Sequence, residues 1–126
     1  MGPKILVIED NEQNLYLTTY ILEAHGYRVI QARDGREGIE KAAQERLALI
    51  LLDIQLPGVD GYTVARELRR NPALDGVPIV AVTSYAMVGD RERTLDAGCV
   101  GYIEKPINPE TFVAEVEGYL SQGGEP

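Results

Sequence analysis

The sequence predicts a single α/β domain in which a parallel five-stranded sheet lies between two layers of helices. Runs of branched apolar residues recur along the chain, as expected for strands that are buried on both faces. Amphipathic stretches lie between these runs and predict helices. The length of 126 residues is typical of one domain.

Three strong apolar runs and two weaker ones predict the strands. The strong runs are Ile5–Ile8, Leu47–Leu52 and Ile79–Val82, and the weaker ones are Tyr27–Ala32 and Gly101–Ile103. Because strands and helices alternate, we expect parallel pairing through right-handed crossovers. Sheets of this kind carry their functional groups at the carboxyl ends of the strands.

Helix boundaries are predicted from capping residues, glycines and prolines. The first helix buries one face and ends at His25-Gly26, and the third ends where Asn71-Pro72 breaks it. The last is expected to start at Asn108-Pro109, because asparagine caps helices and proline suits their first position. The last helix should turn Phe112, Val113, Val116 and Leu120 inward. The second helix is predicted over about Gly35–Gln44, the third from Asp60-Gly61, and the fourth over about Met87–Asp96.

Composition and charge exclude several classes of protein. The 12 basic and 20 acidic residues leave a formal charge of −8, which argues against a nucleic-acid partner. A single cysteine, Cys99, excludes an intramolecular disulfide and favours a reduced interior. No apolar run approaches the ~18 residues of a membrane span, and no signal peptide is found. We therefore expect a soluble, cytoplasmic protein without a membrane partner.

Polar residues gather where four of the predicted strands end. Glu9 and Asp10 follow the first strand, Asp53 the third, Thr83 the fourth and Lys105 the fifth. If the strand order is 2-1-3-4-5, the first and third strands flank the point where the order reverses. That order would bring the three carboxylates together.

Three carboxylates in one crevice would repel one another, so the cluster should bind protons or a cation. Oxygen ligands without histidine or thiol favour Mg²⁺, with Mn²⁺ tolerated. Each residue could also have a structural role alone, since Asp10 could cap a helix and Lys105 could be a solvated surface charge. Together, however, the Thr83 hydroxyl and the Lys105 ammonium would complete a cradle for phosphoryl oxygens, with Asp53 as the nucleophile.

These motifs resemble the receiver domain of bacterial two-component response regulators, from about Lys4 to Leu120. The resemblance rests on Glu9-Asp10-Asn11, the block Asp53–Gly61, Thr83-Ser84 and the block Gly101–Pro106, in the order that the family requires. It implies a flavodoxin-like fold, a three-layer sandwich with strand order 2-1-3-4-5. Residues 1–122 would form the receiver domain, and residues 123–126 a flexible tail.

The resemblance also implies a role for each site residue. Asp53 would take a phosphoryl group from a kinase or phosphotransfer-protein histidine, and Glu9 and Asp10 would hold Mg²⁺ together with Asp53 and the Gln55 carbonyl. Thr83 and Lys105 would contact the phosphoryl group. The remaining implied roles are a switch pair of Thr83 and Tyr102, a cis bond before Pro106, and control of phosphoryl lifetime by Gln55 and Tyr85.

The stretch Ala86–Arg93 is similar to stand-alone regulators of the DivK type and to receivers attached to hybrid histidine kinases, and the sequence leaves both open. Departures from the family are small: Glu9 replaces a commoner aspartate, Ser84 an alanine, and Leu56, Val59 and Val100 also differ. Because no output domain is found, we expect phosphorylation to be read by a separate effector protein at the face formed by the fourth helix, fifth strand and fifth helix.

Three other functions fit the sequence less well. A Mg²⁺-dependent phosphatase needs an acid to protonate the leaving group, and Ile54 and Gln55, which follow Asp53, are not ionisable. A flavin carrier needs a phosphate loop after the first strand, where acids stand instead. The lone histidine, His25, lies at a helix end, which favours a structural role over phosphotransfer. We therefore expect a signalling module that turns over no external substrate.

Overall fold

The computed structural model describes residues 2–56, 58, 60–84 and 89–123. A five-stranded parallel sheet runs in the order β2-β1-β3-β4-β5, which confirms the predicted topology. β1 and β3 are therefore neighbours, and their carboxyl ends lie at the same edge of the sheet. The strands are β1 (Lys4–Ile8), β2 (Arg28–Ala32), β3 (Leu49–Asp53), β4 (Ile79–Thr83) and β5 (Gly101–Glu104).

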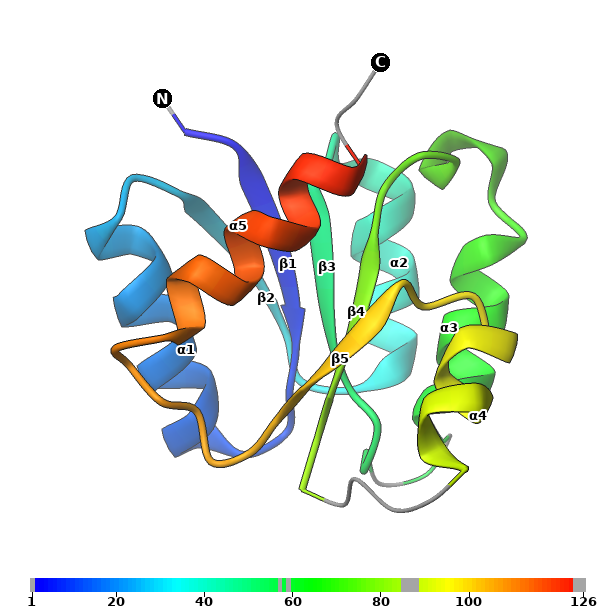
Figure 1. Cartoon of the computed structure of the whole chain (residues 1–126). Helices are drawn as coiled ribbons and strands as arrows, with labels where there is room; N and C mark the ends of the chain where they lie inside the picture. Colours follow the sequence, from blue (N-terminus) through cyan, green and yellow to red (C-terminus); the bar gives the residue numbers. More distant parts are fainter. Residues whose placement is uncertain (1, 57, 59, 85–88, 124–126) are drawn as a thin grey trace.

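Helices cover both faces of the sheet and complete the three predicted layers (Figure 1). α1 and α5 lie on one face, and α2, α3 and α4 lie on the other. A short 3₁₀ helix, Pro72–Leu74, follows α3. The helices are α1 (Glu12–Ala24), α2 (Gly35–Gln44), α3 (Gly61–Arg69), α4 (Asp90–Asp96) and α5 (Phe112–Gly123).

Alternate strand residues supply two separate cores, which explains why the central strands are apolar throughout. In β1, Leu6 and Ile8 pack against the α2 and α3 side, whereas Ile5 and Val7 pack against α1 and α5. β3 and β4 divide their residues in the same way. Because successive side chains point to opposite faces, a strand between two helical layers needs apolar residues at every position.

The edge strand β2 departs from this pattern. Arg28 is exposed and the next three residues are only half-buried, so the expectation of burial on both faces applies to β1, β3 and β4 but not to β2. No helix in the described ranges is long and apolar enough to cross a membrane.

The predicted start of the last helix is wrong. Asn108 does not cap α5; its Oδ1 accepts a hydrogen bond from the Glu110 backbone N–H at 2.9 Å and closes a turn. The first i to i−4 bond of this region runs from the Phe112 N–H to the Asn108 carbonyl oxygen at 2.9 Å, and α5 begins at Phe112. Phe112 and Val116 are fully buried, while Val113 and Leu120 pack only partly against the same core.

Other boundaries shift by smaller amounts. β3 begins at Leu49 and includes Asp53, so the acid is the last residue of the strand. α4 is described from Asp90, and the predicted start at Met87 lies outside the described residues. α5 extends through Gly123, the first residue of the predicted tail, and residues 124–126 lie outside the described part.

Candidate functional site

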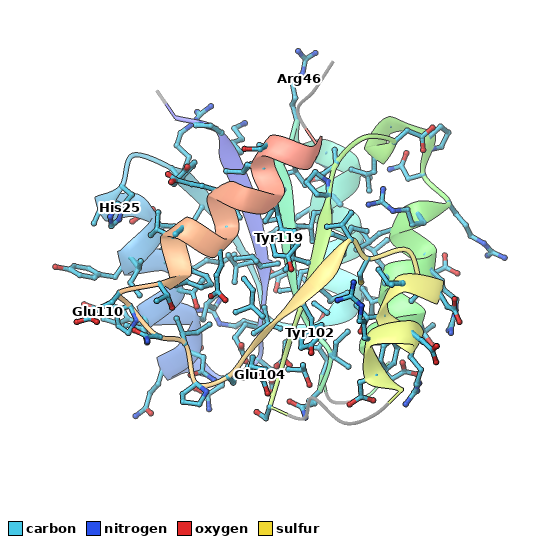
Figure 2. All side chains as sticks on the ribbon, viewed as in Figure 1. His25, Arg46, Tyr102, Glu104, Glu110 and Tyr119 are labelled. Atoms are coloured by element: carbon cyan, nitrogen blue, oxygen red, sulfur yellow. The ribbon has the colours of Figure 1, made fainter. Side chains whose placement is uncertain are left out.

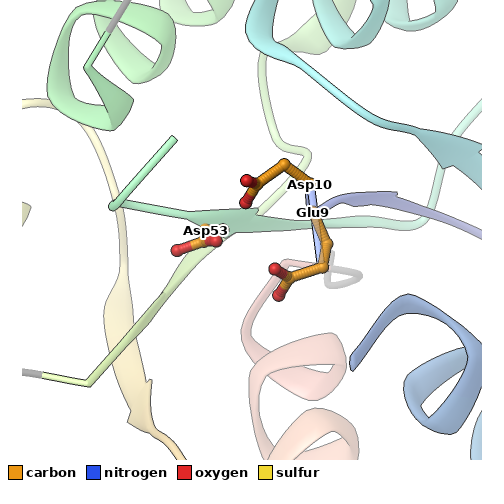
Figure 3. Close-up of side chains that lie close together, drawn as sticks. All are labelled: Glu9, Asp10 and Asp53. Atoms are coloured by element: carbon orange, nitrogen blue, oxygen red, sulfur yellow. The ribbon is translucent and has the colours of Figure 1, made fainter. Parts of the chain in front are cut away.

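The residues predicted at the strand ends lie together at one edge of the sheet. Glu9 and Asp10 follow β1, and Asp53 ends the neighbouring β3, so parallel pairing brings their side chains into one cluster (Figure 3). One carboxylate oxygen from each residue lies within 4.8 Å of the others. The geometry therefore brings together the three acids that the sequence singles out.

Two of these acids are buried and the third is exposed. The exposed fraction is 2% for Asp53 and 5% for Glu9, whereas Asp10 faces solvent. Asp10 does not cap α1, because Asn11 occupies the N-cap position and accepts a hydrogen bond from the Asn14 N–H at 2.9 Å. The alternative that Asp10 caps a helix is therefore wrong, because Asn11 caps α1.

Lys105 contributes a cation to the two buried carboxylates. Its Nζ lies 3.2 Å from Glu9 Oε1 and 3.2 Å from Asp53 Oδ2. Its own side chain is only 14% exposed, so little water screens either pair. One ammonium group cannot neutralise three carboxylates, and the cluster retains negative charge that suits a divalent cation.

Backbone donors hold the same carboxylates in place. The Gln55 N–H donates to Asp53 Oδ1 at 2.9 Å, and the Asn11 N–H donates to Glu9 Oε2 at 3.2 Å. Such bonds fix the orientation of each carboxylate before any ligand arrives. The site is therefore preorganised by the two loops that follow β1 and β3.

The pKa of Glu9 is raised to about 7 from 4.5. Burial is the largest cause, followed by the hydrogen bond with Asp53 and by repulsion from its carboxylate, while Lys105 and the Asn11 N–H oppose the shift. The cluster can therefore relieve its charge near neutral pH by binding either a proton or a cation.

This shift predicts that the metal-free protein loses stability as the pH rises from about 5 to about 7.5. The folded state keeps a proton on Glu9 that the unfolded chain releases near pH 4.5, so the free energy of unfolding should fall by on the order of 3 kcal/mol. Urea unfolding in EDTA measures this change. Glu9→Gln, which cannot ionise, should show a much smaller loss; an identical pH profile for both proteins would contradict the assignment.

Thr83 and Tyr102 lie on neighbouring strands. Thr83 ends β4, is 7% exposed, and its carbonyl oxygen accepts the Lys105 N–H at 2.8 Å. Tyr102 is half-buried on β5 and packs against the core on the α3 side (Figure 2). The Lys105–Pro106 bond is cis, as the resemblance implies.

The sequence did not reveal what Gly61 and Ser84 contribute to this edge of the sheet. A Cβ on Gly61 would lie 2.5 Å from the Ile54 Cα and 2.9 Å from the Asp53 carbonyl oxygen, so only glycine lets α3 begin this close to the acid. The Ser84 N–H donates to Gln55 Oε1 at 3.1 Å. Both contacts depend on how the loops pack in the tertiary structure. Gly61 does belong to the block Asp53–Gly61 on which the resemblance rests, but its packing role could not be read from that block. The predicted lifetime residue Tyr85 lies outside the described residues.

His25 and Cys99 lie outside the acidic cluster, and each has a structural setting. The ring Nδ1 of His25 donates to the Ile21 carbonyl oxygen at 2.9 Å, at the C-terminal end of α1. Cys99 is buried, and burial raises the pKa of its thiol to about 12, so the reactive thiolate is disfavoured.

A parallel sheet of this order, with an acidic cluster and a lysine at its carboxyl edge, is the arrangement that the resemblance to receiver domains implies. The family model for the response regulator receiver domain matches residues 5–117. The chain is 42% identical over 120 residues to the polar-differentiation response regulator DivK of Brucella anthropi, covering 95% of this chain and 98% of DivK.

Solved structures agree with this match. A CheY-like receiver domain protein from Methanospirillum hungatei JF-1 has a TM-score of 0.89 and 31% identity, covering 98% of this chain and 97% of its own. The receiver domain of the Pseudomonas aeruginosa sensor histidine kinase PA1611, which has a magnesium ion in its active-site cleft, has a TM-score of 0.87 and 36% identity, covering 95% and 98%. The chain belongs to the response regulator receiver family of two-component signalling.

Proposed function

We propose that this protein is a response regulator in which Asp53 accepts a phosphoryl group from a histidine kinase or a histidine phosphotransfer protein, in a Mg²⁺-dependent reaction. The main support is the buried Asp53 carboxylate, which lies 3.2 Å from Lys105 in a cluster with Glu9 and Asp10. Residues 1–122 would form the receiver domain, acting in the cytoplasm and signalling to a separate effector protein rather than to nucleic acid or a membrane.

In the proposed reaction a carboxylate oxygen of Asp53 attacks phosphorus, and the bond from phosphorus to the donor imidazole breaks. The electron pair returns to the imidazole nitrogen, and an aspartyl phosphate forms. Lys105 and Thr83, which lie at the ends of the neighbouring strands β5 and β4, would contact the phosphoryl oxygens. No external substrate is turned over, because Ile54 and Gln55 offer no acid for a leaving group.

The oxygen donor set supports Mg²⁺, with Mn²⁺ tolerated. Glu9, Asp10, Asp53 and the Gln55 backbone carbonyl would hold the ion, which when bound would neutralise charge on the transferring group. The magnesium ion of the Pseudomonas receiver supports this choice.

Acetyl phosphate is expected to add the mass of one phosphoryl group to the protein when Mg²⁺ is present. The small phosphodonor replaces the kinase, so the result depends only on this chain. Intact-mass spectrometry with and without EDTA measures the product. Absence of labelling at saturating Mg²⁺ would overturn the proposed function, and equal labelling in EDTA would overturn the role of the metal.

A switch at Thr83 and Tyr102 is part of the proposal. A phosphoryl group offers the Thr83 hydroxyl a charge-assisted hydrogen bond, and movement of Thr83 toward it would leave room for the Tyr102 ring to move further inward. Beryllofluoride, which mimics the phosphoryl group, should change affinity for a partner kinase by roughly five- to thirtyfold. Titration calorimetry with wild type and Thr83→Ala tests this route; an equal change in both proteins would exclude Thr83.

A further inference from the structure

The side chain of Gln55 joins two loops at the functional site. Its backbone N–H donates to Asp53 Oδ1 at 2.9 Å, and its Oε1 accepts the Ser84 N–H at 3.1 Å. One residue therefore contacts both the acid at the end of β3 and the first backbone donor beyond β4. The two contacts link the Ser84 N–H to the Asp53 carboxylate through a single residue.

The orientation of the Gln55 carboxamide follows from these contacts. Only its oxygen can accept the Ser84 N–H, so the Nε2 group must point away from Ser84. Nε2 is buried and has no acceptor within the described ranges. A buried N–H₂ group without an acceptor is unfavourable. The carboxamide therefore makes one hydrogen bond through its oxygen, while its Nε2 donor has no acceptor within the described ranges. This weak hold would let the side chain move if the Ser84 N–H found another acceptor.

A phosphoryl group on Asp53 would bring anionic oxygens into this region. An N–H bond to a charged oxygen is about twice as strong as one to a neutral amide oxygen. The Ser84 N–H therefore gains by exchanging its Gln55 partner for the phosphoryl group. Because Ser84 is adjacent to Thr83, this exchange would accompany any movement of Thr83 toward the same group.

We infer that Gln55 is a positioning residue that latches the β4 end to the Asp53 loop before phosphorylation, and that the phosphoryl group competes with it for the Ser84 N–H. This inference rests on the proposed function. It assigns the carboxamide a role in the resting state, distinct from the proposed effect of Gln55 on phosphoryl lifetime. Removing the carboxamide should therefore favour the phosphoryl-bound form.

Gln55→Met, which keeps the length of the side chain without its acceptor, tests the latch. In the protein without ligand, the Ser84 amide should exchange with solvent roughly three- to tenfold faster than in wild type. Mg²⁺ and beryllofluoride should bind the variant more tightly, by a factor of the same order. Exchange followed by NMR and binding followed by titration give the two readouts.

Ser84→Ala is the matched control, because it alters an exposed side chain and keeps the backbone N–H. Its exchange rate and its affinity for beryllofluoride should stay close to wild type. Equal Ser84 exchange in wild type and Gln55→Met would overturn the latch, and equal or weaker binding by Gln55→Met would overturn the competition. Failure of wild type to bind beryllofluoride would instead overturn the proposed function on which this inference rests.

Discussion

Asp53→Asn is expected to acquire no phosphoryl group from acetyl phosphate at any Mg²⁺ concentration. Asparagine has almost the same shape and its Oδ1 can still accept the Gln55 N–H, so the loop should keep its structure. An amide oxygen is not a competent nucleophile, and Lys105 retains Glu9 as its partner at 3.2 Å. The expected loss is therefore one of chemistry and not of folding.

Asp10→Ala is the informative comparison for this result. Asp10 is exposed and belongs to the acidic cluster, so its removal leaves the nucleophile in place. The variant should still be labelled but should need at least about tenfold more Mg²⁺, equivalent to about 1.4 kcal/mol. Intact-mass spectrometry across a Mg²⁺ titration separates the two variants. Undiminished labelling of Asp53→Asn would show that another residue is the acceptor.

Arg69→Met should lower the free energy of unfolding by about 3 kcal/mol. The guanidinium at the end of α3 donates to the carbonyl oxygens of Leu74 at 2.9 Å, Val77 at 2.5 Å and Gly98 at 3.0 Å. Hydrogen bonds to charged groups contribute about 1.5 to 3 kcal/mol each, and the variant would leave partly buried carbonyls without this donor. Methionine keeps much of the apolar stem, so the lost bonds dominate.

The next residue supplies the control for this prediction. Arg70 is 78% exposed in its side chain and pairs with Glu67 at 3.2 Å on the helix surface. Exposed pairs of this kind contribute little, so Arg70→Met should change the free energy of unfolding by less than about 0.5 kcal/mol. Urea unfolding followed by circular dichroism measures both. Equal losses in the two variants would mean that the three carbonyl contacts of Arg69 do not contribute specifically.

The Arg69 side chain also adds a second reason for the glycine that ends α4, where the Gly98 N–H donates to the Leu95 carbonyl oxygen at 3.0 Å. Gly98 has a φ of +103°, and a Cβ there would lie 2.4 Å from the Arg69 Cγ. The left-handed turn at the end of α4 favours glycine, and the packed Arg69 side chain leaves no room for a Cβ there. The local sequence predicts the glycine, but the contact with Arg69, 29 residues away, depends on the tertiary structure.

Local patterns determined the class of fold, and the strand order implied by the resemblance was needed to locate the site. The apolar runs that became β1, β3 and β4 could be recognised because burial between two helical layers demands apolar residues at every position. The acids were predictable because a parallel sheet aligns its carboxyl ends, which brings Glu9 and Asp10 to Asp53 once the strand order is known. The start of α5 could not be predicted, since Asn108 can cap a turn as readily as a helix.

Only the tertiary structure decided how the site is assembled. Lys105 lies 3.2 Å from carboxylates on two other strand ends, and Gln55 meets Ser84 across two loops, in pairs separated by up to 96 residues. These distances depend on the register of the sheet and on the paths of the loops, which short-range sequence patterns do not encode. The raised pKa of Glu9 has the same origin, because burial and the nearby Asp53 carboxylate exist only after the strands pair.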